Sequence, residues 1–119
     1  MKASTFYAAA NLIQTQGLIK GAFQDSSIGV SGPLCAIAAL RVAKGLEPTY
    51  FGGGGMDPQT AGVVREAAFL RNNVLPAKHD YRENWSNPIL SFNNHPETTK
   101  EDVVAALTFA GDIAVASGY

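Results

Sequence analysis

The segment from residue 31 to residue 45 constrains the fold more than any other part of the chain. Its apolar residues cover well over half of a helix circumference, and its only charges, Arg41 and Lys44, lie near its end. Pro33 suits the first helical position, where its missing N–H would be unpaired anyway, and Gly45 suits the left-handed residue that follows a helix. A helix that is apolar nearly all round is buried. We therefore predict a central helix against which the other elements pack.

Three further helices are predicted from spacing and end signals. The first spans residues 4–16, carries no charged side chain, and ends at Gly17. An uncharged exposed side of this kind is also suited to binding a partner. The third helix opens at residues 57–60, where Asp57 caps it and Pro58 lies in its first turn, and it ends at residues 72–73. Its apolar positions are Val63, Val64, Ala67, Ala68 and Leu70.

The last helix has the clearest start, because Thr98 and Glu101 have the spacing of a capping box. Its core-facing positions are Val103, Val104, Leu107, Ala110 and Ala114. Gly111 is unfavourable inside a helix, so we expect either a close helix contact or a bend there. Residues 18–31 and 74–91 are predicted to be irregular connections, the second extended or loosely helical.

Length and composition indicate one mainly α domain over residues 1–119, with about four helices around the buried central one and long irregular connections. Only 16% of the residues are charged, which favours a homo-oligomer or a partner-binding face. The net charge of −1 argues against nucleic-acid or membrane-surface binding. A nucleic-acid binder would need its cations on one face, namely Lys20, Arg41, Lys44 and Arg65 or Arg71.

The chain shows no signal-peptide pattern and no apolar run long enough to span a membrane. A single cysteine excludes an internal disulfide framework. Both observations predict a cytoplasmic protein.

Cys35 is the one residue that suggests covalent catalysis. The first turn of a helix lowers the pKa of a thiol, and His79 and His95 are the available bases, with Asp80, Asn93 or Asn94 to orient them. A Cys–His hydrolase or transferase with Cys35 as nucleophile and His95 as base is therefore the alternative function. The preferred interpretation makes Cys35 a small buried hydrophobic residue and the protein no enzyme.

No cofactor or metal is predicted, because the potential ligands do not have metal-site spacing. The four glycines at residues 52–55 precede a helix start, but Asp57 would repel a phosphate and no Lys-Ser/Thr pair follows. We interpret them as a flexible connector or lid.

The 74–91 connection contains, between Pro76 and Pro88, residue types that dominate protein interfaces, and two more aromatic residues lie beside the glycines. The predicted protein-binding residues are Tyr81, Arg82, Trp85, Tyr50 and Phe51. The partner is a host protein or a second copy of the chain, as in a homodimer.

Residues 32–40 and 90–103 resemble a family of small proteins of unknown function from actinobacteria and their phages. The matching residues are those from Ala8 to Gly17, those from Cys35 to Leu40, and Phe92, Asn93, Asn94, Pro96, Thr99 and Val103. The chain departs from the family pattern at Ala38, usually glycine, at Phe92, usually Trp, and at Asn94, usually Asp. The resemblance implies that Cys35 lies in the core and that Asn93 and Asn94 hold the turn before the last helix. It implies a phage or actinobacterial source and assigns no activity.

Overall fold

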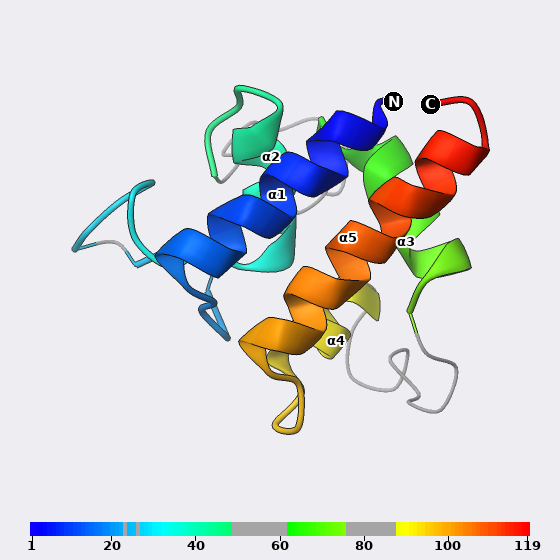
Figure 1. The fold of residues 1–119 in the computed structure, drawn as a ribbon. Helices are drawn as coiled ribbons and strands as arrows, with labels where there is room; N and C mark the ends of the chain where they lie inside the picture. The colour runs from blue at the N-terminus through cyan, green and yellow to red at the C-terminus, as the bar shows by residue number, and fades with distance from the viewer. Residues whose placement is uncertain (23, 26, 49–61, 76–87) are drawn as a thin grey trace, which may run out of the picture.

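The structure is a computed structural model that describes residues 1–22, 24–25, 27–48, 62–75 and 88–119. Five α-helices lie in this part of the chain (Figure 1): α1 (Ala3–Gln16), α2 (Ala36–Ala43), α3 (Val64–Asn73), α4 (Pro88–Asn94) and α5 (Lys100–Ala116). Extended pairing among the described residues is limited to isolated bridges that Leu34 forms with Leu18 and Gln24. The predicted mainly α fold is confirmed.

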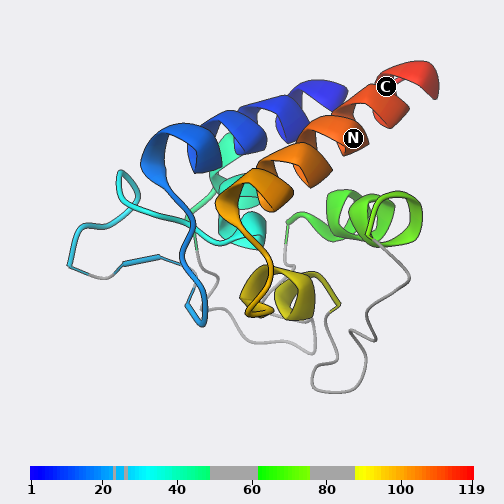
Figure 2. The same ribbon diagram turned by 60° about the horizontal axis from the view of Figure 1, so that its bottom comes forward.

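The helices form two layers (Figure 2). α1 and α5 run antiparallel in one layer, and α2, α3 and α4 lie beneath them. α1 packs most extensively against α5 and next against α2. At one end of this layer the backbone N–H of Ala3 donates to the carbonyl oxygen of Tyr119 at 3.4 Å. The start of α1 and the end of α5 are therefore neighbours.

The prediction of a buried central helix is confirmed, since every residue from Leu34 to Leu40 is at most 1% exposed. The predicted start of this helix is wrong. Pro33 precedes it, Cys35 is its N-cap, and Ala36 is its first residue. The reason lies in Leu34, whose N–H donates to Gly17 and whose carbonyl accepts from Ile19, so its backbone is engaged by the preceding segment. Gly45 has a φ of +82°, as the predicted stop signal requires.

The start of α3 also differs from the prediction. Asp57 and Pro58 lie outside the described residues, and the helix itself begins only at Val64. Gly62 has a φ of +82°, a left-handed conformation that a continuous helix from residue 57 would not allow. The face is rotated as well, because Val64 is 52% exposed and Glu66 is 1% exposed. The buried Glu66 carboxylate pairs with the Lys44 ammonium at 3.1 Å, which compensates its burial.

The segment before α5 contains a short helix, α4, where we predicted an extended or loosely helical connection. Pro88 is its first residue, and it ends at Asn94, one residue before the His95–Pro96 step, which disfavours helical conformation. The capping box of α5 is displaced by one residue from the predicted pair, because it consists of Thr99 and Asp102. The N–H of Thr98 donates to the carbonyl of His95 at 3.0 Å, which keeps Thr98 in the preceding turn.

Gly111 marks a close helix contact, one of the two predicted possibilities. A Cβ atom at this position would lie 2.6 Å from the Tyr7 ring of α1. The absence of a side chain at Gly111 thus lets the Tyr7 ring lie across α5.

Within the described residues, no helix combines the length and the apolarity that crossing a bilayer requires.

Candidate functional site

Cys35 lies at the start of α2 with no exposed surface. Its Sγ accepts a hydrogen bond from the backbone N–H of Ala38 at 3.3 Å. Burial raises the pKa of the thiol from 9.0 to about 11, and the hydrogen bonds from Ala38 and Ile37, which lower the pKa, only partly offset it. The helix start therefore does not generate a thiolate here, since desolvation outweighs it. The structure does not favour Cys35 as a nucleophile.

His95 lies in the turn between α4 and α5 and is partly exposed. Its Nδ1 accepts a hydrogen bond from the backbone N–H of Glu97 at 3.1 Å, and its carbonyl accepts one from Lys20 Nζ at 2.6 Å. The hydrogen bond of Cys35 thus lies within α2 in the core, whereas those of His95 with Glu97 and Lys20 lie toward the surface. The other candidate base, His79, and its candidate partner Asp80 lie outside the described residues.

Asn93 joins three segments of the fold. Its Oδ1 accepts from the N–H of Ala36 at 3.0 Å, at the start of α2, and its Nδ2 donates to the carbonyl of Ile19 at 3.0 Å. The neighbouring Asn94 accepts from the N–H of Gly21 at 2.8 Å. Because Asn93 has no exposed surface, these bonds replace contacts with water. The two side chains hold the 17–22 segment and the start of α2 against α4.

The remaining residues of the family-like motif surround this turn. Phe92 is buried at 6% exposure, Thr98 at 8%, while Pro96 and Glu101 are exposed. Phe92 and Thr98 are therefore the members of this motif that pack inside the fold.

Two of the cations named for a nucleic-acid surface, Arg41 and Lys44, are engaged by other groups of the protein. Arg41 is only 5% exposed, and its Nε donates to the carbonyl of Glu47 at 2.7 Å. Lys44 contacts the buried Glu66 carboxylate and donates to the carbonyl of Gly62 at 2.8 Å. The structure therefore does not gather the full set on one open surface.

The predicted interface residues Tyr50, Phe51, Tyr81, Arg82 and Trp85, and the glycines at 52–55, lie outside the described residues. Their role stays a prediction. In the part of the chain that the structure describes, no group of three or more metal-ligating side chains is present.

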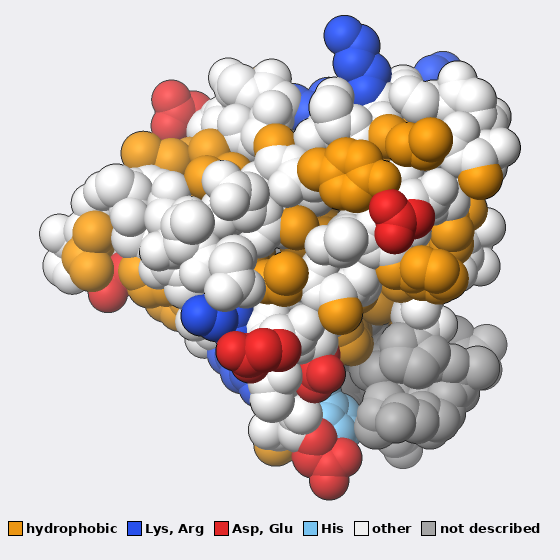
Figure 3. Space-filling view, viewed as in Figure 1, with side chains coloured by type: hydrophobic (Ala, Val, Ile, Leu, Met, Phe, Trp, Pro, Cys, Tyr) orange, Lys and Arg blue, Asp and Glu red, His pale blue; other side chains and the backbone are white. Residues whose placement is uncertain are grey.

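The outer surface of α1 and α5 is the most distinctive open surface of the described chain. We call it the α1–α5 face and define it by the exposed residues of α1 and by those of α5 from Ala105 onward; Glu101 and Asp102, which are also exposed, form the acidic start of α5 at one end of this face. From α1 the face contains Ser4, Tyr7, Ala8, Asn11, Gln14 and Thr15, and from α5 it contains Ala105, Thr108, Phe109, Asp112, Val115 and Ala116. No other described helix covers this face, and Figure 3 shows hydrophobic side chains spread along it, with charged groups mainly at its margins.

The face is almost free of charge. α1 contributes none, and Asp112 is its single charged residue. The Tyr7 hydroxyl donates to Asp112 Oδ1 at 2.6 Å, which raises the pKa of Tyr7. Phe109 and Val115 remain 54% and 57% exposed. Depletion of charged side chains together with exposed aromatic residues is the compositional signal of a protein interface.

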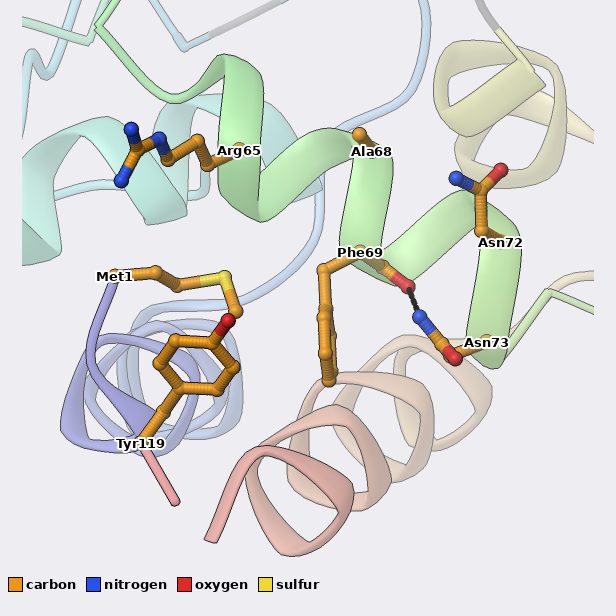
Figure 4. A pocket seen from close by; sticks show the side chains of 7 residues that line it. All are labelled: Met1, Arg65, Ala68, Phe69, Asn72, Asn73 and Tyr119. Carbon is orange, nitrogen blue, oxygen red and sulfur yellow. Dashed lines mark hydrogen bonds between the residues drawn. The ribbon is translucent and has the colours of Figure 1, made fainter. Parts of the chain in front are cut away.

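A shallow hollow of about 350 Å³ extends from one end of this face (Figure 4). It lies beside α3, and its wall combines apolar and aromatic side chains with two amides and one guanidinium. The lining residues are Met1, Arg65, Ala68, Phe69, Asn72, Asn73 and Tyr119. The rings of Phe69 and Tyr119 meet edge to face at 6.3 Å between centroids. The hollow is open to solvent and widens the surface available to a partner at this end.

The comparison with protein families gives one result. A model described as a family of unknown function (DUF6197) matches residues 2–113. The chain belongs to this family. No curated protein and no solved structure gives a match.

Membership in DUF6197 agrees with the resemblance to a family of unknown function and adds no activity. The actinobacterial or phage source stays a prediction. In this DUF6197 chain the uncharged first helix is evident from the sequence, whereas the matching surface of α5 was not predicted. The sequence contains a sign of this surface. Residues 103–116 carry a single charge, Asp112, and the helical spacing of the core-facing residues places it on the exposed side.

Proposed function

We propose that this chain is a protein-binding domain that acts without catalysis, and that the α1–α5 face is its binding surface. One observation carries the proposal: two antiparallel helices present a continuous outer surface with exposed Phe109 and Val115, on which Asp112 is the single charge beyond the acidic first turn of α5. Helices on the surface of a monomeric protein normally carry charged and polar residues toward water. A face with few charges and with exposed Phe109 and Val115 is suited to contact with another protein.

The partner of this surface is a host protein or the chain itself, and the location we propose is the cytoplasm. The buried thiol supports the non-catalytic part of the proposal, because a nucleophilic cysteine needs both access and a thiolate. The loop residues predicted as interface anchors, Tyr81 and Trp85 among them, are proposed as further contacts with the same partner.

Site-specific photo-crosslinking tests the proposal. A photoreactive phenylalanine analogue replaces Val115 on the face, and in a matched variant it replaces Ile28, which is equally exposed at 57% but lies on the loop before α2. Both tagged variants are irradiated in cells of the species from which the gene derives. We expect a discrete crosslinked product from position 115, with this chain or another protein, and none from position 28.

Equal products from both positions would show nonspecific contact and contradict the choice of this face. Absence of any product from positions 115, 109 and 85 would contradict protein binding itself. Replacement of Trp85 in this series also tests the loop that the sequence singled out.

A further inference from the structure

We infer that the occupant of the α1–α5 face is a second copy of this chain, stacked face to face so that each α5 lies antiparallel to the α5 of the other copy. The inference rests on the proposed function and specifies its partner. In this arrangement the twofold axis crosses α5 near Thr108, its middle residue.

The charge pattern of the face supports a self-contact. In a twofold contact every charge on the surface is doubled, so a self-binding surface must be nearly uncharged or must separate its like charges. Between Ala105 and Ala116 the single charge is Asp112, to which the Tyr7 hydroxyl donates, and the exposed Glu101 and Asp102 lie at the start of α5. Asp112 lies four residues beyond Thr108, so an axis at Thr108 puts the two copies of Asp112 about 12 Å apart along the helices.

The same axis brings the exposed rings of Phe109 together. Phe109 is one residue from the middle of α5 and is 54% exposed, so the two rings meet beside the axis and shield each other from water. The positions around it are small, with Ala105 and Thr108 on the same exposed stripe. Small residues let two helices approach closely, and the aromatic pair fills the space at the edge.

The charges at the two ends of the face favour the antiparallel arrangement. Lys2 lies at the end where α1 begins and α5 finishes, as the Ala3–Tyr119 hydrogen bond shows. Glu101 and Asp102 lie at the opposite end of α5. Antiparallel stacking brings Lys2 of each copy to the acidic end of the other, whereas parallel stacking would bring the two acidic ends together. The opposed helix dipoles of the two α5 segments add to this preference.

The size of the face predicts a weak, reversible dimer. Helices of 14 and 17 residues are about 21 and 25 Å long, and two of them side by side are about 20 Å wide. The flat footprint is therefore on the order of 450 Å² per copy, below the roughly 600–1,000 Å² per partner of stable interfaces and in the range of weak, transient ones. We expect a dissociation constant of about 1–100 µM.

Analytical ultracentrifugation of the purified chain over a wide concentration range tests the association. We expect the 12.5 kDa monomer at low concentration and a species of twice that mass at high concentration. Phe109→Asp should raise the dissociation constant at least about 30-fold, the effect of losing a hot-spot aromatic residue. Ile28→Asp, a substitution at a comparably exposed hydrophobic position, should leave it unchanged.

Cysteine crosslinking tests the arrangement without depending on a destabilising substitution. Under mild oxidation, Thr108→Cys should give a disulfide-linked dimer, because the two sites face each other across the axis. Ala116→Cys should give none, because its copies lie about 24 Å apart, far beyond the reach of a disulfide. The native Cys35 is buried and does not compete.

The possible results separate this inference from the proposed function. A chain that stays monomeric at millimolar concentration, but crosslinks from position 115 to a different protein, overturns the self-contact and leaves protein binding intact. A dimer that crosslinks through residue 116 rather than residue 108, or that tolerates Phe109→Asp, overturns the antiparallel arrangement. A monomer without any crosslinked product overturns both.

Discussion

At the scale of single residues, burial decides the chemistry of the side chains that first suggest a function. Cys35 and Asn93 both have no exposed surface, and both accept a hydrogen bond from the start of α2. The thiol accepts from the N–H of Ala38, and the amide oxygen accepts from the N–H of Ala36. Each therefore serves as a partner for backbone N–H groups that the first turn of a helix leaves free. Their effects on the protein are expected in its stability and not in a reaction.

The thiol of Cys35 is expected to be unreactive in the folded protein. Because its pKa is raised from 9.0 to about 11, its thiolate fraction at pH 8 is about 100-fold below that of the unfolded chain. Iodoacetamide should modify the native protein at least that much more slowly than the protein in guanidinium, as followed by mass spectrometry. Equal rates in both states would contradict the burial of the sulfur.

The same shift has a consequence for pH dependence. Folding favours the neutral thiol, so the stabilisation is complete below about pH 9 and is lost as the pH rises toward about 11.

Asn93→Ala should destabilise the fold by about 2–3 kcal/mol, because the N–H of Ala36 and the carbonyl of Ile19 lose their buried partner. Equilibrium unfolding in urea at low micromolar concentration measures this loss. Asn72→Ala is the control, since Asn72 is exposed on α3, and its effect should stay within about 0.5 kcal/mol. A similar small effect for Asn93 would mean that water replaces its bonds.

At the scale of helices, the end signals were easier to identify than to place. The central helix and α5 were both predicted, yet each begins at a later residue than expected, at Ala36 and Lys100. In both cases a neighbouring segment engages the backbone just before the helix, through Leu34 in one and Thr98 in the other. Such long-range or turn contacts leave no periodic pattern in the sequence.

The contact between α1 and α5 at Gly111 predicts that the effect of Gly111→Ala on stability depends on whether the Tyr7 ring is present. In the wild type, Gly111→Ala places a Cβ 2.6 Å from the Tyr7 ring and should displace the ring from Asp112. In a Tyr7→Ala background the same substitution should stabilise the protein by about 1 kcal/mol, the helix-propensity gain. Thermal or urea unfolding of the four proteins measures the coupling. Additive effects would contradict the close contact.

At the scale of the whole molecule, the two-layer arrangement leaves one side of the α1–α5 layer uncovered by the other described helices. The core beneath it is continuous and includes residues of all five helices. Only 16% of the residues of the chain are charged, and few of these charges lie on the α1–α5 face. This is the face that we propose as the surface of association.

A charge exchange tests this assignment at the same scale. Lys2→Glu should weaken the dimer about two- to fivefold at low ionic strength, since it places like charges beside Glu101 of the other copy. Adding Glu101→Lys should restore most of the affinity. In about 1 M salt the difference should vanish, because the Debye length falls to about 3 Å. Sedimentation equilibrium measures each constant, and no salt dependence would contradict the pairing of the two ends.

The sequence by itself determined the fold class and the buried α2, and it limited Gly111 to a close contact or a bend, between which the Tyr7 ring decided. These features depend on local periodicity, on the apolar content of one segment and on the properties of glycine. The buried Glu66 next to Lys44, the short α4 and the exact starts of α2 and α5 were decided by tertiary structure. They depend on contacts between segments far apart in the chain, for example the contact of Asn93 with Ala36.

The candidate site divides in the same way. The sequence showed that residues 3–16 lack charge, but it did not show which neighbour would complete a surface. Only the packing of α5 beside α1 joined the exposed side of α5, which carries Phe109 and Val115, to that uncharged helix. The physical reason is that a helix fixes which of its own residues share a side, whereas the assembly of two helices into one surface is fixed by the core they bury together.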